Sequence, residues 1–224
     1  MKKYVRRPAF TPLWVQPHSL QEVFRRYLPA KRTLLPWLVR LAPVLEVDEE
    51  IELRPLQHED AETLFELIEN NREHLRTWLG WVNKVRTLSH SRDFINYANY
   101  DTIYSGKWVY SIWYRGQLAG LMDFNEASRE LRQVSLGYWL GADFQGKGII
   151  TRVCQRCLAF AFNEKHVDKI HIKCATDNVR SQAVALRLRM GWEGIEHDSG
   201  TLNGRSVDMI VYGITRGEWR RMQH

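Results

Sequence analysis

The stretch that decides the fold reads Gly137-Tyr138-Trp139-Leu140, then four linking residues, then Gln145-Gly146-Lys147-Gly148-Ile149-Ile150. The first part has strand character, and the second opens a helical pattern. Glycines let a backbone approach a ligand closely, and the first turn of a helix leaves N–H groups without partners. With the helix dipole and Lys147, these donors predict an anion site suited to a pyrophosphate. A plain strand-to-helix turn also favours glycine, and the stretch matches neither the Walker loop nor G-x-G-x-x-G.

Regular patterning extends to both sides of this stretch. Before it, the sequence predicts strands near 51–56, 108–114, 117–125 and 131–140, and helices near 61–68, 75–79 and 94–104. After it, the sequence predicts helices over 150–162 and 181–189, and strands near 169–175, 192–196 and 207–214. This order predicts an α/β fold (α+β mixed), with helices on the faces of a mixed sheet.

Charge divides the chain of 224 residues into two parts. Residues 1–45 carry nine Lys or Arg against one acid, so the overall charge of +6 splits into +8 there and −2 over residues 46–224. Six of the seven prolines also lie in residues 1–45. We therefore expect a basic, Pro-rich N-terminal extension (1–45) before one folded domain (46–224).

The extension allows two interpretations. Its aromatic and basic residues could bind a polyanion such as RNA, the ribosome, a phospholipid surface or an acidic partner. They could equally form a strap packed on the domain, or on a second subunit of a homodimer. No secretory signal and no apolar run of about 18 residues is present, which predicts no transmembrane segment. Three cysteines, a low and odd count, fit a reducing compartment, so we expect a cytoplasmic protein.

A second motif follows about thirty residues after the loop, where Asn178-Val179-Arg180-Ser181 opens another helix. The loop resembles the acetyl-CoA loop of the GNAT N-acetyltransferases, and the second motif resembles their next one. Within that superfamily the chain is most similar to the RimJ/RimL-like branch of ribosomal-protein N-terminal acetyltransferases. Further matches are Asn71-Arg72 with Leu75 and Trp78, Leu136 through Leu140, Leu202-Asn203-Gly204, and Asp208 through Tyr212. The resemblance covers roughly residues 50–216.

The resemblance implies a central, mostly antiparallel twisted sheet with a splayed strand pair that receives acetyl-CoA, and direct acetyl transfer to an amine without a metal. Backbone N–H groups of Trp139 or Leu140 would stabilise the oxyanion. Ser181 would protonate the departing thiolate, although its hydroxyl could instead cap the helix. The residues implied to bind acetyl-CoA are Tyr138, Trp139, Leu140, Gln145, Gly146, Lys147, Gly148, Ile149, Ile150 and Asn178.

Several positions depart from the family pattern. No Tyr lies between Asn178 and Trp192, where many relatives carry the acid, and the helix there has room to be extended or kinked. Positions where relatives carry a Glu are Gly200 and Ser135 in this chain. No general base is assigned, and the candidates are Asp123, His197, Asp198 and Asp208. Cys154-x-x-Cys157 lacks a second ligand pair and predicts buried thiols rather than a zinc site.

Three functions remain open for this sequence. The first is an N-terminal acetyltransferase acting on a protein, plausibly a ribosomal one. The second is a small-amine or antibiotic acetyltransferase. The third is a catalytically weak acyl-CoA-binding module that works by interaction, an alternative kept open by Gly200 and Ser135.

Overall fold

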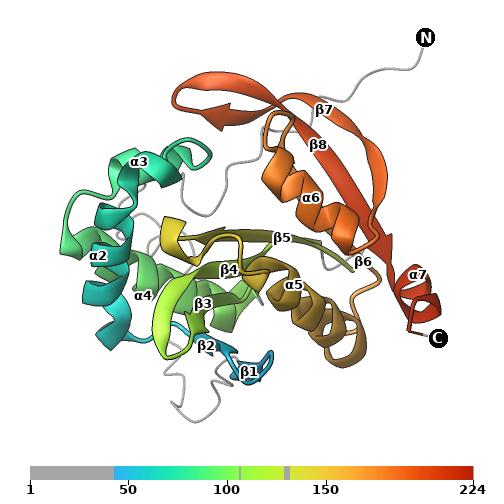
Figure 1. Ribbon diagram of the computed structural model, residues 1–224, viewed down its shortest axis with the longest axis horizontal. Coiled ribbons are helices and arrows are strands. Elements are labelled where there is room, and N and C mark those ends of the chain that lie inside the picture. Colours follow the sequence, from blue (N-terminus) through green and yellow to red (C-terminus); the bar gives the residue numbers. More distant parts are fainter. Residues whose placement is uncertain (1–42, 106, 129–131, 224) are drawn as a thin grey trace, which may run out of the picture.

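One sheet of eight strands organises residues 43–105, 107–128 and 132–223, which the computed structural model describes (Figure 1). The strand order is β1-β2-β3-β4-β5-β6-β8-β7. All neighbouring strands are antiparallel except β5 and β6, which are parallel. The predicted mixed, mostly antiparallel sheet is therefore confirmed. Most of the predicted extension, residues 1–42, lies outside the described residues.

The elements fall into a strand-rich centre and helical connections. The strands are β1 (Leu45–Glu46), β2 (Ile51–Pro55), β3 (Val109–Tyr114), β4 (Gln117–Ser128), β5 (Gln133–Leu140), β6 (Lys169–Ala175), β7 (Gly191–Leu202) and β8 (Arg205–Thr215). The α-helices are α2 (Ala61–Asn70), α3 (Arg72–Leu75), α4 (Leu88–Ser105), α5 (Ile149–Ala159), α6 (Val179–Arg187) and α7 (Arg216–Arg221). Short helical turns are η3 (His58–Asp60), η4 (Gly80–Lys84), η5 (Ala142–Phe144) and η6 (Phe160–Glu164).

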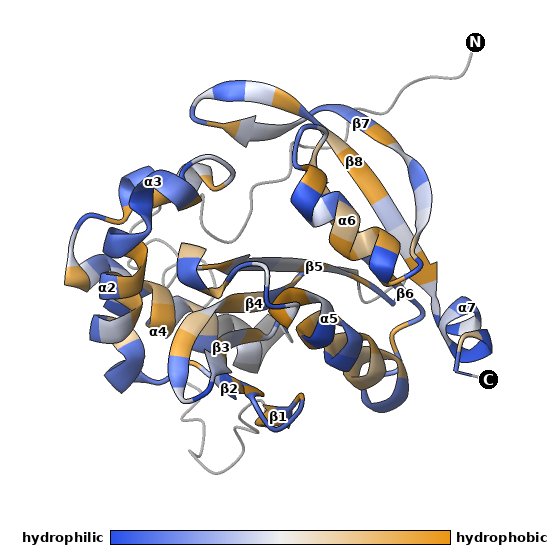
Figure 2. Cartoon of the chain, viewed as in Figure 1, coloured by the Kyte–Doolittle hydropathy of each residue, from blue (hydrophilic) through white to orange (hydrophobic). Residues whose placement is uncertain are grey.

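Both faces of the sheet bury apolar side chains. On one face α5 and α6 pack over a core that includes Tyr110, Phe124 and Val153. On the other face α2, α4 and η4 enclose a second core, which includes Leu121 and Trp139. The helices show the matching amphipathic pattern, with polar residues on their outer turns (Figure 2). Because side chains alternate along a strand, the central strands β3, β4 and β5 contribute to both cores.

The strand pair β5–β6 opens partway along its length. Gln133 through Ser135 pair with Lys169 through His171, and the register ends there. Beyond Ser135, β5 continues beside β4, whereas β6 continues beside β8. The end of β5 at 138–140 therefore lines an opening between two strands that were neighbours, which confirms the predicted splay.

Several boundaries differ from those predicted by the sequence. The helix predicted near 75–79 is instead α3 at Arg72–Leu75, and the residues that follow form a turn before η4. Helix α4 begins at Leu88 rather than near residue 94, and β7 continues to Leu202 rather than ending near residue 196. Helix α6 is neither extended nor followed by a kinked helix. It ends at Arg187, and Arg189 adopts a positive φ of 55° in the turn that follows. The extra residues there are taken up by a tight left-handed turn, which periodicity alone does not reveal.

Candidate active site

The loop between β5 and α5 has the backbone that an anion site requires. Gly146 and Gly148 have φ values of +73° and +71°, and no atom lies within 4 Å of where their Cβ atoms would be. Gly148 is the N-cap of α5, so the N–H groups of the first helical turn have no preceding carbonyl to bind. The loop is thus open on its outer side and lined by backbone donors, as expected for a pyrophosphate site.

Neighbouring charged residues hold this loop in place. The Lys147 ammonium lies 5.5 Å from the ring centre of Tyr114 and 5.6 Å from that of Phe144, a cation–π arrangement. Arg152 of α5 donates to the Lys147 carbonyl at 3.3 Å and to the Asp48 carboxylate at 2.8 Å. The loop is therefore tied both to its own helix and to the turn between β1 and β2.

The end of β5 presents backbone groups to the opening between β5 and β6. The Gly141 N–H donates to the Ala119 carbonyl at 2.9 Å, so N–H groups at odd positions of β5 point toward β4. The Trp139 carbonyl also points toward β4. A glycine is needed opposite it at residue 120, because a Cβ there would overlap the carbonyl oxygen. The N–H of Leu140 shares the peptide plane of that carbonyl and points the opposite way, into the opening. Of the two predicted oxyanion donors, the geometry favours Leu140 over Trp139.

The start of α6 faces the same opening. The Asn178 side chain caps this helix by accepting a hydrogen bond from the Ser181 N–H at 3.1 Å. The Ser181 hydroxyl has no hydrogen-bond partner among the described residues, so the capping role that the sequence allowed for it is performed by Asn178. The Tyr138 hydroxyl lies 3.5 Å from the Ser181 carbonyl, and burial raises the pKa of that phenol. Tyr138 on β5 and Asn178 at the start of α6, both predicted to bind acetyl-CoA, therefore border the same opening.

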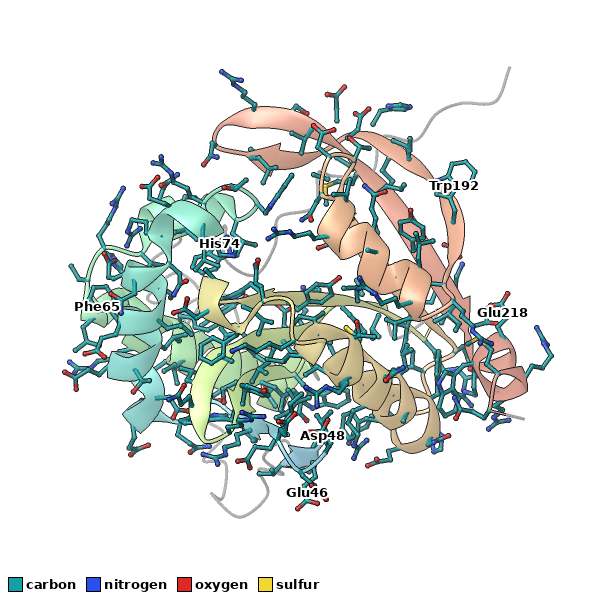
Figure 3. The ribbon with its side chains drawn as sticks, viewed as in Figure 1. Glu46, Asp48, Phe65, His74, Trp192 and Glu218 are labelled. Atoms are coloured by element: carbon teal, nitrogen blue, oxygen red, sulfur yellow. The ribbon has the colours of Figure 1, made fainter. Side chains whose placement is uncertain are left out.

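A polar chain that the sequence did not indicate crosses from α6 to α3. Arg180 donates to the side-chain oxygen of Gln145, and the Gln145 Nε2 donates to His74 Nε2 at 2.6 Å. Figure 3 shows His74 on the side of α3 that turns toward the loop after β5. Asn71 adds a second tie, since its Oδ1 accepts from the Ala142 N–H at 2.8 Å. Only a long-range fold brings residues 71 and 74 beside residues 142 and 145, so no sequence spacing could have shown it.

The β7–β8 hairpin closes over this region. Its tip residue Asn203 donates to the Arg76 carbonyl at 3.0 Å and accepts from the Asn83 side chain at 3.0 Å. A pocket lined by Arg76, Thr77, Asn83 and Asn203 lies beside these bonds. The hairpin therefore reaches from the far edge of the sheet to the segment between α3 and η4 (Figure 1). The predicted Leu202-Asn203-Gly204 match marks this contact.

The four candidate bases lie in two different settings. Asp123 is buried on β4, and its pKa is raised to about 7, chiefly because burial disfavours the charged carboxylate. Asp208 accepts from the Asp198 N–H at 2.9 Å and from His197 at 2.8 Å, and both contacts lower its pKa. These three residues stabilise an exposed irregularity in the β7–β8 hairpin, whereas Asp123 lies inside the sheet.

The structure also places Ser135 and Gly200, the two positions at which the family resemblance led us to look for a Glu. Ser135 lies on β5 opposite Asn125, at the last pair before the strands diverge. Gly200 lies on β7 opposite Val207, and a Cβ there would crowd the Val207 and Met209 side chains. A longer side chain at residue 200 would require Met209 to move. Neither residue 135 nor residue 200 carries a carboxylate in this chain.

The cysteines behave as the sequence predicts. Cys154 and Cys157 are buried on α5 without a disulfide, and burial raises the pKa of both thiols. No group of three or more His, Cys, Asp or Glu side chains able to hold a metal ion is found in the part of the chain that the structure describes. Among the same residues, no helix combines the length and apolar character needed to cross a membrane.

A parallel strand pair that splays beside a glycine-rich helix N-terminus defines the coenzyme-A site of an acyltransferase. The chain belongs to the GNAT acetyltransferase family, since residues 50–191 match the model of the acetyltransferase (GNAT) domain. It is an acetyl-CoA-dependent N-acetyltransferase, and its fold and family are those that the resemblance predicted.

Three known proteins show how similar the chain is to its relatives. YdaF of Bacillus subtilis (strain 168), whose name marks it as a candidate ribosomal N-acetyltransferase, is 32% identical over 180 residues, which cover 78% of this chain and 96% of that protein. The microcin self-immunity acetyltransferase MccE, in complex with acetyl-CoA and AMP, superposes with a TM-score of 0.74 at 33% identity and covers 79% of this chain and 99% of its own. The ribosomal-protein α-N-acetyltransferase RimL, in complex with coenzyme A, gives a TM-score of 0.74 at 26% identity and covers 77% and 98%.

Proposed function

We propose that this enzyme acetylates the α-amine at the N-terminus of a protein or peptide. The observation that carries the proposal is the hairpin contact at Asn203, which bridges β7–β8 to the segment after α3. An extended chain end is thin enough to pass beneath such a bridge, whereas a lysine on a folded surface brings the bulk of that surface with it. RimL is named a ribosomal-protein α-N-acetyltransferase and YdaF a candidate ribosomal N-acetyltransferase, and both names point the same way.

On the acetyl-CoA side, the chain's own groups supply binding and orientation. The backbone N–H groups of Gly146 through Ile150, with Lys147, would hold the pyrophosphate, and Gln145, whose N–H donates to the Ala142 carbonyl, would border it. Backbone groups at the end of β5 and the Asn178 side chain would hold the pantetheine arm. The Leu140 N–H would donate a hydrogen bond to the thioester oxygen as negative charge develops on it. Such a donor lowers the activation free energy by several kcal/mol in comparable sites.

The transfer itself follows from these positions. The amine nitrogen attacks the thioester carbon, the C–N bond forms, and the C–S bond breaks. The Ser181 hydroxyl, which is free of other partners among the described residues, would donate the proton that converts the leaving thiolate to a thiol. Ser181→Ala should therefore lower kcat by about tenfold or more while leaving the Kd for acetyl-CoA unchanged. A variant with unchanged kcat would show that the hydroxyl takes no part in transfer.

The acceptor chemistry also favours an α-amine. With a pKa near ~8, about a tenth of an α-amine is neutral at pH 7, against well under a thousandth of a lysine near ~10.4. A site that holds the amine therefore needs only a modest proton acceptor to use an N-terminus.

A small-molecule amine is the second candidate. The specific observation is the likeness to MccE, at 33% identity and a TM-score of 0.74, in a structure that also contains AMP. A nucleotide-bearing aminoacyl compound carries an α-amine too, so it would present the same reacting group to the site.

The extension and the location of the enzyme belong to the same proposal. Residues 1–45, with a net charge of +8, would dock the enzyme on ribosomal RNA or an acidic partner near its substrate. A cytoplasmic location is supported by the three unpaired cysteines, which suit a reducing compartment.

A panel of acceptors tests the proposal. Thiol release from acetyl-CoA is measured with peptides bearing free N-termini, the same peptides with blocked N-termini, polyamines and aminoacyl nucleotide analogues. We expect the largest kcat/KM for free N-terminal peptides and none above background for the blocked ones. A preference for the nucleotide analogues would favour the second candidate, and a preference for polyamines would contradict the α-amine assignment.

A further inference from the structure

A buried carboxyl group lies on the sheet face covered by α2, α4 and η4, close to the point where β5 and β6 separate. Asp123 on β4 pairs with Gly137 on β5, two residues beyond the last β5–β6 pair at Ser135. Its side chain is only 7% exposed. It shares a sheet face with Leu121 and Trp139, the face covered by α2, α4 and η4 and opposite to that of α5.

The neighbouring strand is shaped around this carboxyl. A Cβ at Gly137 would overlap the Asp123 Oδ1, so the glycine of the Gly137-Tyr138-Trp139 motif makes room for it. Asn125 donates its Nδ2 to the same oxygen at 2.8 Å, and the Gly137 N–H also points to the carboxyl. No ion pair to this carboxyl is found within the described parts of the chain, and the charge of Lys107 lowers its pKa without offsetting the effect of burial.

Two further polar atoms on the sheet face of Asp123 lack partners among the described residues. The Asn125 Oδ1 is a buried acceptor, and the Trp139 Nε1 is a buried donor. Trp139 as a whole is 7% exposed. Buried polar atoms are normally hydrogen-bonded, and those left unpaired inside a protein point to a missing partner. This face thus presents a carboxylate, a free acceptor and a free donor. They complement an aminoacyl group, whose amine would bind the two oxygens and whose carbonyl would accept from the indole N–H.

We propose that Asp123 is the catalytic residue that accepts the proton of the acceptor amine, and that Asn125 Oδ1 helps to orient that amine. This inference rests on the proposed function, since it requires an amine acceptor. Asp123 takes one proton from the ammonium, which leaves a neutral amine with a lone pair. After the lone pair attacks the thioester carbon, Ser181 protonates the leaving sulfur, and the second proton of the nitrogen restores the Ser181 hydroxyl. Asp123 releases the first proton to solvent before the next turnover. One hydrogen remains on the product amide, so all three are accounted for.

Asp123 also supplies what the rest of the site lacks. Residues 135 and 200 are Ser and Gly and so supply no carboxylate, whereas Asp123 lies on the strand beside Ser135 and on the same face of the sheet. His197, Asp198 and Asp208 are engaged with one another on the exposed hairpin. A carboxyl with a pKa of about 7 is suited to accept a proton near neutral pH.

The test compares the same isosteric substitution, Asp to Asn, at the proposed catalytic residue and at a control position. Asp123→Asn removes the proton acceptor but keeps the shape, and Asp208→Asn makes the same change on the exposed hairpin. We measure kcat and KM with a free N-terminal peptide, the Kd for acetyl-CoA by calorimetry, and thermal melting of all three proteins. We expect Asp123→Asn to lose at least about 100-fold in kcat with an unchanged Kd, and Asp208→Asn to stay within about twofold.

A pH profile separates a catalytic role from a structural one. For the wild type, kcat/KM should fall below pH 7 as Asp123 becomes protonated, and this limb should stay in place for two peptides whose N-terminal amines differ in pKa. The limb should be absent in Asp123→Asn. Should that variant fail to fold, the wild-type profile alone decides. An Asp123→Asn enzyme within about threefold of wild type, or a limb that moves with the peptide, would overturn the assignment. Lack of turnover by the wild type with every amine would instead overturn the proposed function, and this assignment with it.

Discussion

Replacing Asp123 with Asn should stabilise the protein at alkaline pH and not at acidic pH. In the folded protein the pKa of Asp123 is raised to about 7, because its carboxylate is removed from water without a cation in contact. In the unfolded chain the group titrates near its usual value of about 3.9. Between these values the folded state binds a proton that the unfolded state has released. The free energy of unfolding of the wild type therefore falls as pH rises through this window.

The size of the effect follows from the two pKa values. A difference of about three pH units, at about 1.36 kcal/mol each, gives about 4 kcal/mol as the largest loss for the wild type between pH 4 and pH 8. Asn keeps an oxygen for the Asn125 and Gly137 donors but cannot ionise. We expect Asp123→Asn to be about 1–4 kcal/mol more stable than wild type at pH 8 and within about 1 kcal/mol of it at pH 4.5.

Urea unfolding at the two pH values measures this difference directly. Asp208→Asn is the matched control with the opposite sign, because hydrogen bonds lower the pKa of Asp208. That variant should gain nothing at pH 8. If the stability difference between wild type and Asp123→Asn is the same at pH 4.5 and pH 8, the carboxyl does not titrate between them and the reasoning fails.

Three further substitutions test the site. Gly137→Ala should cost about 1–3 kcal/mol of unfolding free energy because its Cβ meets the buried carboxyl. Gly191→Ala, whose Cβ would lie 3.8 Å from the Gly213 carbonyl oxygen, should cost less, and equal losses in urea unfolding would contradict this. Gly148→Glu should weaken acetyl-CoA binding more than tenfold by calorimetry, while Gly194→Glu, at another positive φ on the edge strand β7, should leave the Kd unchanged. Asn203→Ala should raise the peptide KM with little change in the Kd for acetyl-CoA, and an unchanged KM would exclude a role of the hairpin bridge in acceptor binding.

The parts of the fold that sequence predicts well are those that local pattern determines. The apolar stripe after Asp60 and the Arg115-Gly116 turn gave a helix and a hairpin in the right places, because both signals lie within a few residues. The loop at Gln145 through Gly148 was predicted for the same reason: its glycines are needed for left-handed backbone, and the helix begins directly after it.

The acceptor side was harder to predict because its contacts join distant segments. His74 and Gln145 are 71 residues apart, and Asn203 and Arg76 are 127 apart, so neither contact leaves a local signature. The sequence pattern indicated no role for Gly137 beyond its place in the strand segment before Tyr138, whereas the structure places it against the Asp123 carboxyl on the adjacent strand. That role depends on the β4–β5 register, which periodicity does not give.

The most direct test of the central claim is to locate the acetyl group on a product. The enzyme is incubated with acetyl-CoA and a peptide that has both a free N-terminus and an internal lysine, and the product is sequenced by tandem mass spectrometry while thiol release is followed. We predict one acetyl group on the α-amine for each thiol released. Acetylation of the lysine alone, or thiol release without a modified peptide, would contradict the account.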